Sequence, residues 1–395
     1  MIKDDEVTLS LENRIQNETV KCWNCNFCIS SCPIIPNTGG FYSHGGSGLT
    51  QSLFYAVKWR LIKGPESKEL MHLIYRCTTC NSCVNRCKEL SAGIPLLEII
   101  KTGRKLLVEN AVGPALTQRK TLENIFKYGN PYGKPAKKRL NWQKEVRVKH
   151  LPEDPAEVLL FIGCSGSYDP ALQIIAKSIV SILKHFNVNF GILREEKCSG
   201  DVALQLGDEA LFLEVASSNI SAFRKSGVKI IVTLSPHDFN SFLKDYPDLQ
   251  PIDIKHYTQF IADLISCHKV ELRRHFNEII TYHDPCYLSK HNNITEQPRK
   301  ILSTISELEI KEIESYGRDS LCCGGGGGRM FADFEEDERL SDIRIKQALK
   351  TNAHIIATAC PWCNTMLNNS IKDLKLEQTL KVMDVAEMFA TAISV

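Results

Sequence analysis

The stretch that decides the fold is KIIVTLSPHDF (residues 229–239), because HIIATACPWCN (residues 354–364) repeats it closely. Each copy leads an apolar, β-branched segment into a turn that contains proline, which is the pattern of a buried strand ending at a loop. The later copy has Cys360 and Cys363 in that loop, whereas the earlier copy has no cysteine there. The same local frame therefore carries two thiols in one copy and none in the other.

The two stretches belong to a longer internal duplication. Cys164 matches Cys286, Cys198 matches Cys322, and Ser235 and Asp238 match the two later cysteines, with gaps that differ by only one or two residues. Strands are predicted at 158–162, 229–234, 279–283 and 354–358, with an amphipathic helix at 171–186. Alternating strands and helices predict α/β layers with a parallel sheet, whose ligands lie beyond the carboxyl ends of the strands.

Half of the 16 cysteines fall into two runs of the spacing C-x2-C-x2-C-x3-C. The runs are Cys22, Cys25, Cys28 and Cys32, followed by Pro33, and Cys77, Cys80, Cys83 and Cys87. This is the bacterial ferredoxin spacing, in which three thiolates bind one cluster and the fourth binds the other. It predicts one [4Fe-4S] cubane on Cys22, Cys25, Cys28 and Cys87, and a second on Cys77, Cys80, Cys83 and Cys32. Zinc knuckles are disfavoured, since they use two C-x-x-C pairs.

The composition is that of an ordinary globular protein. Of the 395 residues, 43% are hydrophobic and 24% charged, and the net charge of +2 gives no reason to expect a nucleic-acid partner. The sequence has no secretory signal and no run of about 20 apolar residues that would make a transmembrane segment. The interpretation is a cytoplasmic protein, held at the inner face of the membrane only through partners, whose cysteines bind metal rather than form disulfides.

The later copy offers five cysteines from three loops: Cys286, Cys322, Cys323, Cys360 and Cys363. A glycine run, residues 324–328, follows the adjacent pair. A backbone without Cβ atoms can approach a sulfide face closely and present N–H donors to it, so Gly324, Gly325 and Gly326 are predicted to contact a cofactor. A P-loop is excluded, because no Gly-Lys-Ser/Thr follows the run.

These cysteines resemble the cysteine-rich domain of heterodisulfide reductases, with its pattern C, C-C-G and C-x-x-C. In that family the five cysteines bind a noncubane [4Fe-4S] cluster, which implies a metal and catalytic site on the five cysteines of the later copy. Two ferredoxin runs, a linker and two cysteine-rich units in this order resemble the D-type chain of these reductases, a fusion of C-type and B-type chains. The iron–sulfur subunits of glycolate, lactate and glycerol-3-phosphate dehydrogenases are similar.

The fold class expected is α+β multidomain. A mostly α, two-cluster ferredoxin-like domain (1–105), with helices at 49–64 and 94–110, precedes a basic linker (106–155) rich in Lys, Gly and Pro. Two duplicated α/β cysteine-rich units follow, a degenerate unit (156–270) and a complete unit (271–395) that carries the noncubane cluster. Cys267 is expected in the core of a helix of the degenerate unit.

The degenerate unit lacks three of the five thiols, since Ser199, Ser235 and Asp238 replace them. Hydroxyls are poor ligands for iron–sulfide, so a second noncubane cluster is not expected. Its remaining thiols, Cys164 and Cys198, are a candidate zinc site with His237 or Asp238, and two buried cysteines without metal are the alternative. The fold is thus duplicated, while the cluster chemistry stays in one copy.

The resemblance implies an iron–sulfur electron-transfer subunit of an oxidoreductase complex. It would relay electrons between a flavoprotein subunit and a quinone, a membrane cytochrome or a thiol/disulfide, through two cubanes and one C-terminal noncubane cluster. One alternative is a catalytic reductase of a CoM-CoB-type heterodisulfide with the noncubane cluster as active site, and another is a scaffold that uses its clusters only to fold. His283, at the end of a strand, is a candidate donor of a hydrogen bond or a proton there, and a structural histidine is the alternative.

Overall fold

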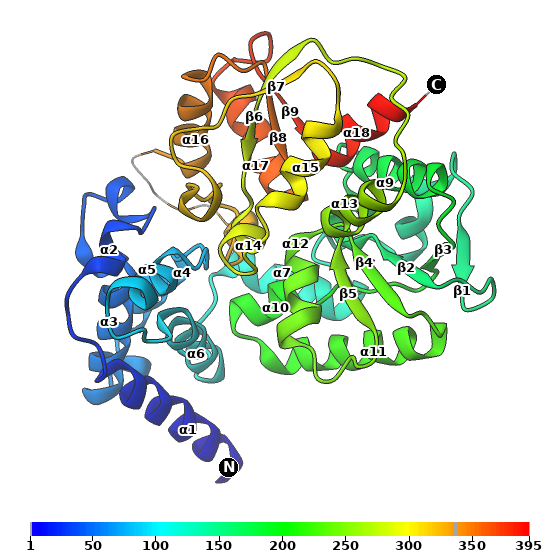
Figure 1. Cartoon of the computed structure of the whole chain (residues 1–395). Coiled ribbons are helices and arrows are strands. Elements are labelled where there is room, and N and C mark those ends of the chain that lie inside the picture. Colours follow the sequence, from blue (N-terminus) through cyan, green and yellow to red (C-terminus); the bar gives the residue numbers. More distant parts are fainter. Residues whose placement is uncertain (1, 333, 335–337, 395) are drawn as a thin grey trace. The chain divides into compact units, whose positions relative to one another are not determined.

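Helices make up the part of the chain that carries the two ferredoxin-type runs (Figure 1). The structure is a computed structural model that describes residues 2–332, 334 and 338–394. Two units can be distinguished, and each is discontinuous in sequence. The first unit comprises Met1–Glu123, Val202–Leu211 and Leu321–Ile343, and the second comprises Asn124–Asp201, Phe212–Ser320 and Arg344–Val395.

The first unit is built around three helices that pack on one another, α1, α3 and α6. Its elements are α1 (Ile2–Thr19), α2 (Phe27–Ser30), η1 (Ile35–Asn37), η2 (Tyr42–His44), α3 (Gly46–Lys58), η3 (Leu61–Lys63), α4 (Ser67–Tyr75), α5 (Ser82–Leu90), α6 (Leu96–Glu109) and η7 (Arg329–Phe331). Helices α3 and α6 confirm the two helices predicted from sequence. They approach so closely that a Cβ on Gly103 would lie 2.4 Å from Leu53 Cδ1, so this crossing requires glycine.

The second unit contains two parallel sheets. The first sheet has the order β1-β3-β2-β4-β5 and the second the order β7-β6-β8-β9, and every pairing is parallel. Their strands are β1 (Lys149–Leu151), β2 (Val158–Phe161), β3 (Phe190–Leu193), β4 (Ile230–Thr233), β5 (Asp253–His256), β6 (Glu278–His283), β7 (Leu308–Ile310), β8 (Ile355–Thr358) and β9 (Lys381–Asp384). Without β1 the two orders correspond strand by strand, which is the duplication seen in the sequence.

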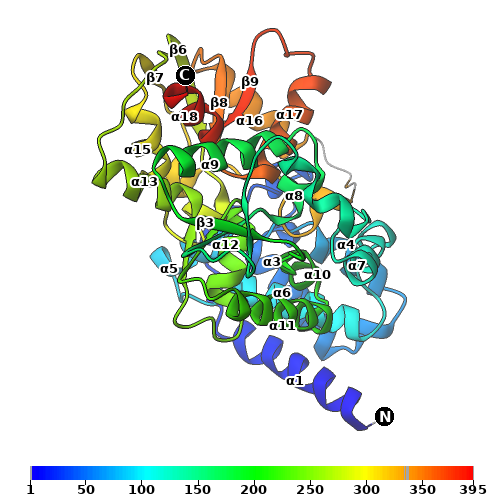
Figure 2. The same ribbon diagram turned by 90° about the vertical axis from the view of Figure 1, so that its right-hand side faces the viewer.

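The four predicted strands are confirmed as β2, β4, β6 and β8, the central strands of the two sheets. The helices of this unit are α8 (Gly163–Tyr168), α9 (Gln173–His185), α12 (Pro236–Asn240), the π-turn η5 (Ser241–Asp245), α13 (Tyr257–Cys267), α14 (Cys286–Ser289), α15 (Glu296–Thr304), the 3-10 turn η6 (Gly317–Asp319), α17 (Pro361–Asp373) and α18 (Val385–Ile393). Helix α9 of the first repeat packs on α18 of the second, and α13 packs on α15, so the repeats share one apolar core (Figures 1 and 2).

The segment expected to be a basic linker carries regular structure. Helix α7 (Leu116–Tyr128) and the 3-10 helix η4 (Ala136–Gln143) lie in it, and it ends in β1. Trp142 and Arg139 of η4 are buried, because the side chains of this basic stretch are divided between a solvated face and the core of the second unit. Helices α10 (Asp201–Leu206), α11 (Glu209–Ser226) and α16 (Leu340–Leu349) each run from a stretch of one unit into a stretch of the other.

One sequence expectation for a cysteine is wrong. Cys267 is exposed and not in the core, because it is the last residue of α13, where the helix leaves its packed face. Within the described part of the chain, none of the helices combines the length and the apolar composition that crossing a bilayer would require.

Candidate metal centres

The first cysteine run lies beside helix α5, where Cys87 is located. Burial raises the pKa of Cys28, and the neighbouring Cys87 and Cys22 raise it further, while hydrogen bonds with Ser47 oppose the shift. Cys25 Sγ is 2.9 Å from the hydroxyl of Ser91, just after the end of α5. Cys22, Cys28 and Cys87 therefore lie near one another, and Cys25 lies beside the residue that follows α5.

The second run contributes to a pocket. Cys77, Cys80 and Cys83 line this pocket together with Cys32, which comes from the first run. Burial raises the pKa of Cys32 to about 12, and Cys80 and Cys77 contribute to that rise. Cys83 behaves in the same way, since its pKa is raised well above the ordinary value by burial and then by the other thiols of the group.

These four thiols, of which Cys80 is buried and the others are partly buried, fit an iron–sulfur cubane. Thiolates that are buried side by side repel one another, so they ionise together only if a cationic core binds between them. Three ligands from one run and a fourth from the other is the arrangement of a two-cluster ferredoxin. Gly46 leaves the room for it, because a Cβ there would lie 2.8 Å from Cys83 Cβ.

Both runs share a backbone feature that the sequence analysis did not identify. Residues two and four positions after the first cysteine have positive φ: Asn24 (52°) and Asn26 (61°) in the first run, Thr79 (53°) and Asn81 (69°) in the second. The asparagines were the available signal, since asparagine tolerates the left-handed region better than most residues. The turned backbone points its N–H groups inward, and Thr79 N donates to Cys77 Sγ at 3.4 Å.

The glycine run of the later repeat belongs to the first unit and lies against the second ferredoxin loop. A Cβ on Gly326 would lie 2.3 Å from Thr78 O, and one on Gly327, at φ +63°, would lie 2.4 Å from Cys77 O. Gly324 N donates to Cys322 Sγ at 3.4 Å, and contact of Gly324, Gly325 and Gly326 with a cofactor stays a prediction. Gly326 and Gly327 therefore do approach another backbone closely, as the sequence leads one to expect. That backbone is the second ferredoxin loop of the protein itself.

Two arginine side chains stabilise the packing of the glycine run on the second ferredoxin loop. The guanidinium of Arg104 is fully buried and donates to four backbone carbonyls, those of Ile74, Cys77, Gln205 and Gly327, at 2.7–3.1 Å. Arg329 donates to Arg76 O at 2.8 Å and to Gly324 O at 3.2 Å. These arginines tie the three stretches of the first unit to one another, and residue spacing gave no signal for them.

In the second unit the later repeat places its cysteines beyond the carboxyl ends of two central strands. Cys286 begins α14, shortly after β6, and Cys360 caps α17 after β8, with Cys363 in the first turn. All three are buried. A ring nitrogen of His283, at the end of β6, lies within 4.8 Å of Cys363 Sγ. Burial lowers the pKa of His283 to about 3, and the positive charge of Arg344 lowers it further, so this ring is neutral.

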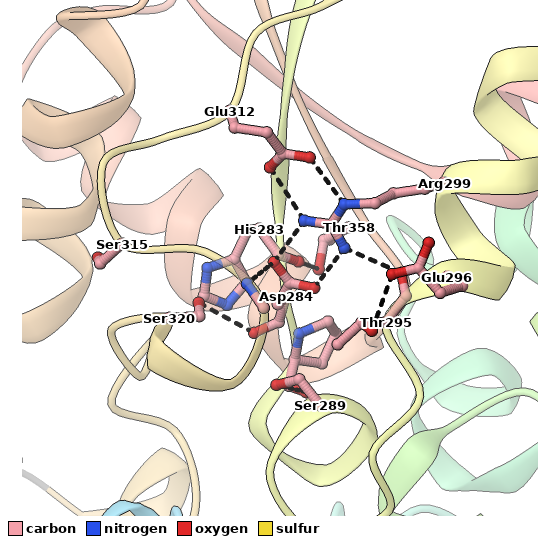
Figure 3. Close-up of polar contacts among 12 residues, drawn as sticks. His283, Asp284, Ser289, Thr295, Glu296, Arg299, Glu312, Ser315, Ser320 and Thr358 are labelled. Atoms are coloured by element: carbon pink, nitrogen blue, oxygen red, sulfur yellow. Dashed lines mark hydrogen bonds and ion pairs between the residues drawn. The ribbon is translucent and has the colours of Figure 1, made fainter.

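A salt-bridge cluster fixes the loop before Cys286 (Figure 3). Asp284 accepts two hydrogen bonds from Arg299, at 2.7 and 2.9 Å, and one from Gly317 N at 2.7 Å. Glu312 accepts two more from Arg299, at 2.7 and 2.9 Å. Paired, two-pronged contacts of this kind hold geometry well, so this cluster sets the position of Cys286. The sequence analysis did not identify Arg299 or Glu312.

The matching place in the first repeat is filled by an ion pair. Arg139 donates to Glu196 Oε1 at 2.6 Å and to Cys164 Sγ at 3.2 Å, and all three residues are buried. Burial alone would raise the pKa of Cys164, but hydrogen bonds with Cys198 and Arg139 and the charge of Arg139 bring it below the ordinary value. Cys198 has its pKa raised well above the ordinary value, first by its hydrogen bond with Cys164 and then by burial.

A zinc ion at Cys164 and Cys198 stays a prediction. In the described chain, no set of three ligand atoms within 4.8 Å of one another includes Cys164 or Cys198. His237 instead pairs with Asp201 at 3.0 Å, and its ring stacks on Tyr287 and lies tilted against Trp362, with ring centroids 3.8 and 4.0 Å away. Arg139 already supplies a positive charge beside the thiol of Cys164.

Comparison with known proteins agrees with a ferredoxin-like part followed by two repeats. The family model of the cysteine-rich domain matches residues 158–241 and 280–368, and the model of the 4Fe-4S dicluster domain matches residues 18–90. A solved structure of a hypothetical protein from Helicobacter pylori has a similar fold, with a TM-score of 0.53 and 14% identity over 88% of this chain and 68% of that one.

Three curated relatives indicate which family of proteins the chain belongs to. The probable iron-sulfur-binding oxidoreductase FadF of Bacillus subtilis is 36% identical and the EtfAB:quinone oxidoreductase of Syntrophomonas wolfei 33%, over 81% and 80% of this chain. The chain spans about half the length of these two relatives, 46% in each case. The D-type chain of the dihydromethanophenazine:CoB--CoM heterodisulfide reductase of Methanosarcina barkeri is 31% identical over 94% of this chain and 93% of that one. With a match along almost its full length, the chain belongs to the D-type heterodisulfide reductase family of iron–sulfur proteins.

Proposed function

We propose that this chain is an electron-transfer subunit of an oxidoreductase complex, which relays electrons between a flavoprotein partner and a quinone. The observation that carries the proposal is the pocket lined by Cys32, Cys77, Cys80 and Cys83, because a thiol from one run completes the set of the other. The relative from Syntrophomonas wolfei, whose name joins EtfAB to quinone, supports the choice of donor and acceptor. Cubane clusters, when bound, supply carriers that accept and release electrons.

Three centres are proposed. Cys22, Cys25, Cys28 and Cys87 would hold one cubane, and Cys77, Cys80, Cys83 and Cys32 the second. The third centre would be the noncubane cluster, with Cys286, Cys322, Cys323, Cys360 and Cys363 as its ligands. The thiolate donor type suits iron–sulfide in each case, and the residues around the thiols supply burial and N–H donors such as that of Gly324.

Iron content tests the three centres. Protein prepared without oxygen should contain about twelve irons per chain, since each centre has four. The variant Cys87→Ala should lose about four irons and the paramagnetic signal of the first-run cluster, although Cys87 belongs to the second run. Cys267→Ala is the matched control, because this cysteine is exposed and outside the motifs. Loss of the second-run signal in Cys87→Ala would contradict the crossed ligation.

Electron flow tests the role. Anaerobic protein would be reduced with a photoreduced flavin and then mixed with a soluble quinone, while low-temperature paramagnetic resonance follows each cluster. All three centres should gain an electron from the flavin and lose it to the quinone. Cluster signals that stay unchanged throughout would overturn the proposal and favour a scaffold.

A further inference from the structure

Arg344 is a buried cation whose hydrogen bonds all go to neutral groups. It is fully buried at the start of the last stretch of the second unit. Its Nη1 donates to Ser315 O at 2.9 Å and to Gln347 Oε1 at 3.0 Å, and its Nη2 donates to Ser320 Oγ at 3.3 Å. Its Nε donates to His283 Nδ1 at 3.1 Å. Among the described residues, no carboxylate lies within ion-pair distance of Arg344.

Two other arginines of the same unit, the buried Arg139 and the partly buried Arg299, behave differently. Arg139 pairs with Glu196, and Arg299 is held by Asp284 and Glu312. Asp284 and Glu312 also act on Arg344 electrostatically, but their oxygens already accept from Arg299. An arginine that is buried without a contacting anion is costly, so its charge is expected to have a partner when the protein is complete.

The surroundings of Arg344 point to that partner. Burial lowers the pKa of Arg344 to about 10, and the group that opposes this shift along with Asp284 and Glu312 is Cys363. Arg344 also contacts His283, a ring nitrogen of which lies within 4.8 Å of Cys363 Sγ. A guanidinium can only donate, so Nδ1 of His283 is the acceptor and the ring proton is on Nε2.

We infer that Arg344 is a positioning residue of the C-terminal iron–sulfur centre, fixing the His283 tautomer as an N–H donor to sulfur and supplying the positive charge that offsets the thiolates. This inference rests on the proposed function, because it needs a cluster at Cys363. Cluster potentials respond to net charge and to hydrogen bonds at sulfur, so a cation at this place favours the reduced form.

Replacement of Arg344 tests the inference through the reduction potential. In the full-length, cluster-loaded protein, Arg344→Gln should shift the oxidised-to-reduced ratio of the third centre at least tenfold toward oxidised at the potential where the wild type is half reduced. For a one-electron couple, a tenfold change corresponds to about 59 mV. The two cubane signals serve as internal references and should keep their potentials. Arg344→Lys retains the charge and should shift the third centre less.

Lys346→Gln is the matched control, because it removes the same charge from an exposed position of the same helix, α16. It should leave the potential unchanged. Loss of about four irons in Arg344→Gln but not in Arg344→Lys would also support the inference. An unchanged potential in Arg344→Gln, or an equal shift in Lys346→Gln, would overturn it. Wild-type protein with only about eight irons would instead overturn the third centre of the proposed function, and this result is distinct from an unchanged potential in a protein with about twelve irons.

Discussion

Asp238 occupies, in the first repeat, the position of a proposed cluster ligand of the later repeat. It stands where the later repeat has Cys363, and it is buried in α12 next to the loop of Gly163, where a Cβ would lie 2.4 Å from Asp238 Oδ2. Burial raises the pKa of Asp238 to about 8, with the charges of Cys164 and Glu196 adding to the rise. A carboxyl held in its neutral form can pack tightly where a metal-bound thiolate stood.

The raised pKa of Asp238 predicts a pH-dependent stability. Between pH 4 and 8 the folded protein keeps the proton that the unfolded chain releases, so rising pH favours unfolding. The free energy of unfolding should therefore fall relative to that of Asp238→Asn, by on the order of 1 kcal/mol per pH unit. Urea unfolding of both proteins at several pH values measures the difference. Asp253→Asn, at an exposed position, should show no such trend.

At the scale of elements, the strands that could be predicted from the sequence are those marked by the internal repeat and by apolar runs. The inner strands β2, β4, β6 and β8 were predicted from their apolar runs. The edge strands β1, β5, β7 and β9 carry polar residues such as Lys149 and Glu309 and were not predicted, and neither was the buried inner strand β3. Cysteine spacing gave the proposed ligand sets, which stay predictions. Supporting residues could not be predicted, because pairs such as Arg344 and His283 are 61 positions apart and only the fold brings them together.

Adding a single methyl group to the glycine run is expected to destabilise the protein. In Gly327→Ala the new Cβ would meet Cys77 O at 2.4 Å, and the residue would also keep an unfavourable φ of +63°. We expect this variant to unfold at lower urea concentration and to lose iron from the second-run cluster. Gly227→Ala is the matched control, since Gly227 has φ +68° but no atom within 4 Å of the new Cβ. Equal losses in the two variants would show that φ, and not the contact, is the cause.

At the scale of the whole molecule, the ferredoxin-like part is more than the N-terminal segment. The stretch Val202–Leu211 supplies Leu206 O, which accepts from the buried Tyr75 hydroxyl at 2.7 Å. Two of the four carbonyls bound by Arg104 also come from later stretches, at Gln205 and Gly327. The family model of residues 18–90 covers the cluster-binding loops and leaves out these supports.

A fragment of residues 1–123 should therefore be less stable than the same residues in the full chain. It would leave the Tyr75 hydroxyl and part of the Arg104 guanidinium without their partners, and each unpaired buried group costs about 1–3 kcal/mol. Hydrogen exchange measured by mass spectrometry should show faster exchange in α4 and α6 of the fragment. Equal protection in fragment and full chain would contradict this prediction.

The first unit is built from three separate stretches of the chain, and this limits how recombination between genes could exchange it. The chain changes unit after residues 123, 201, 211, 320 and 343, so no single recombination breakpoint in the gene can transfer this unit whole. A crossover near residue 123 would combine the cysteine loops of one parent with the glycine run of the other, and Gly326 and Gly327 tolerate only the loop backbone that they meet at Thr78 and Cys77. Chimaeras between distant relatives should work only when all three stretches come from the same parent.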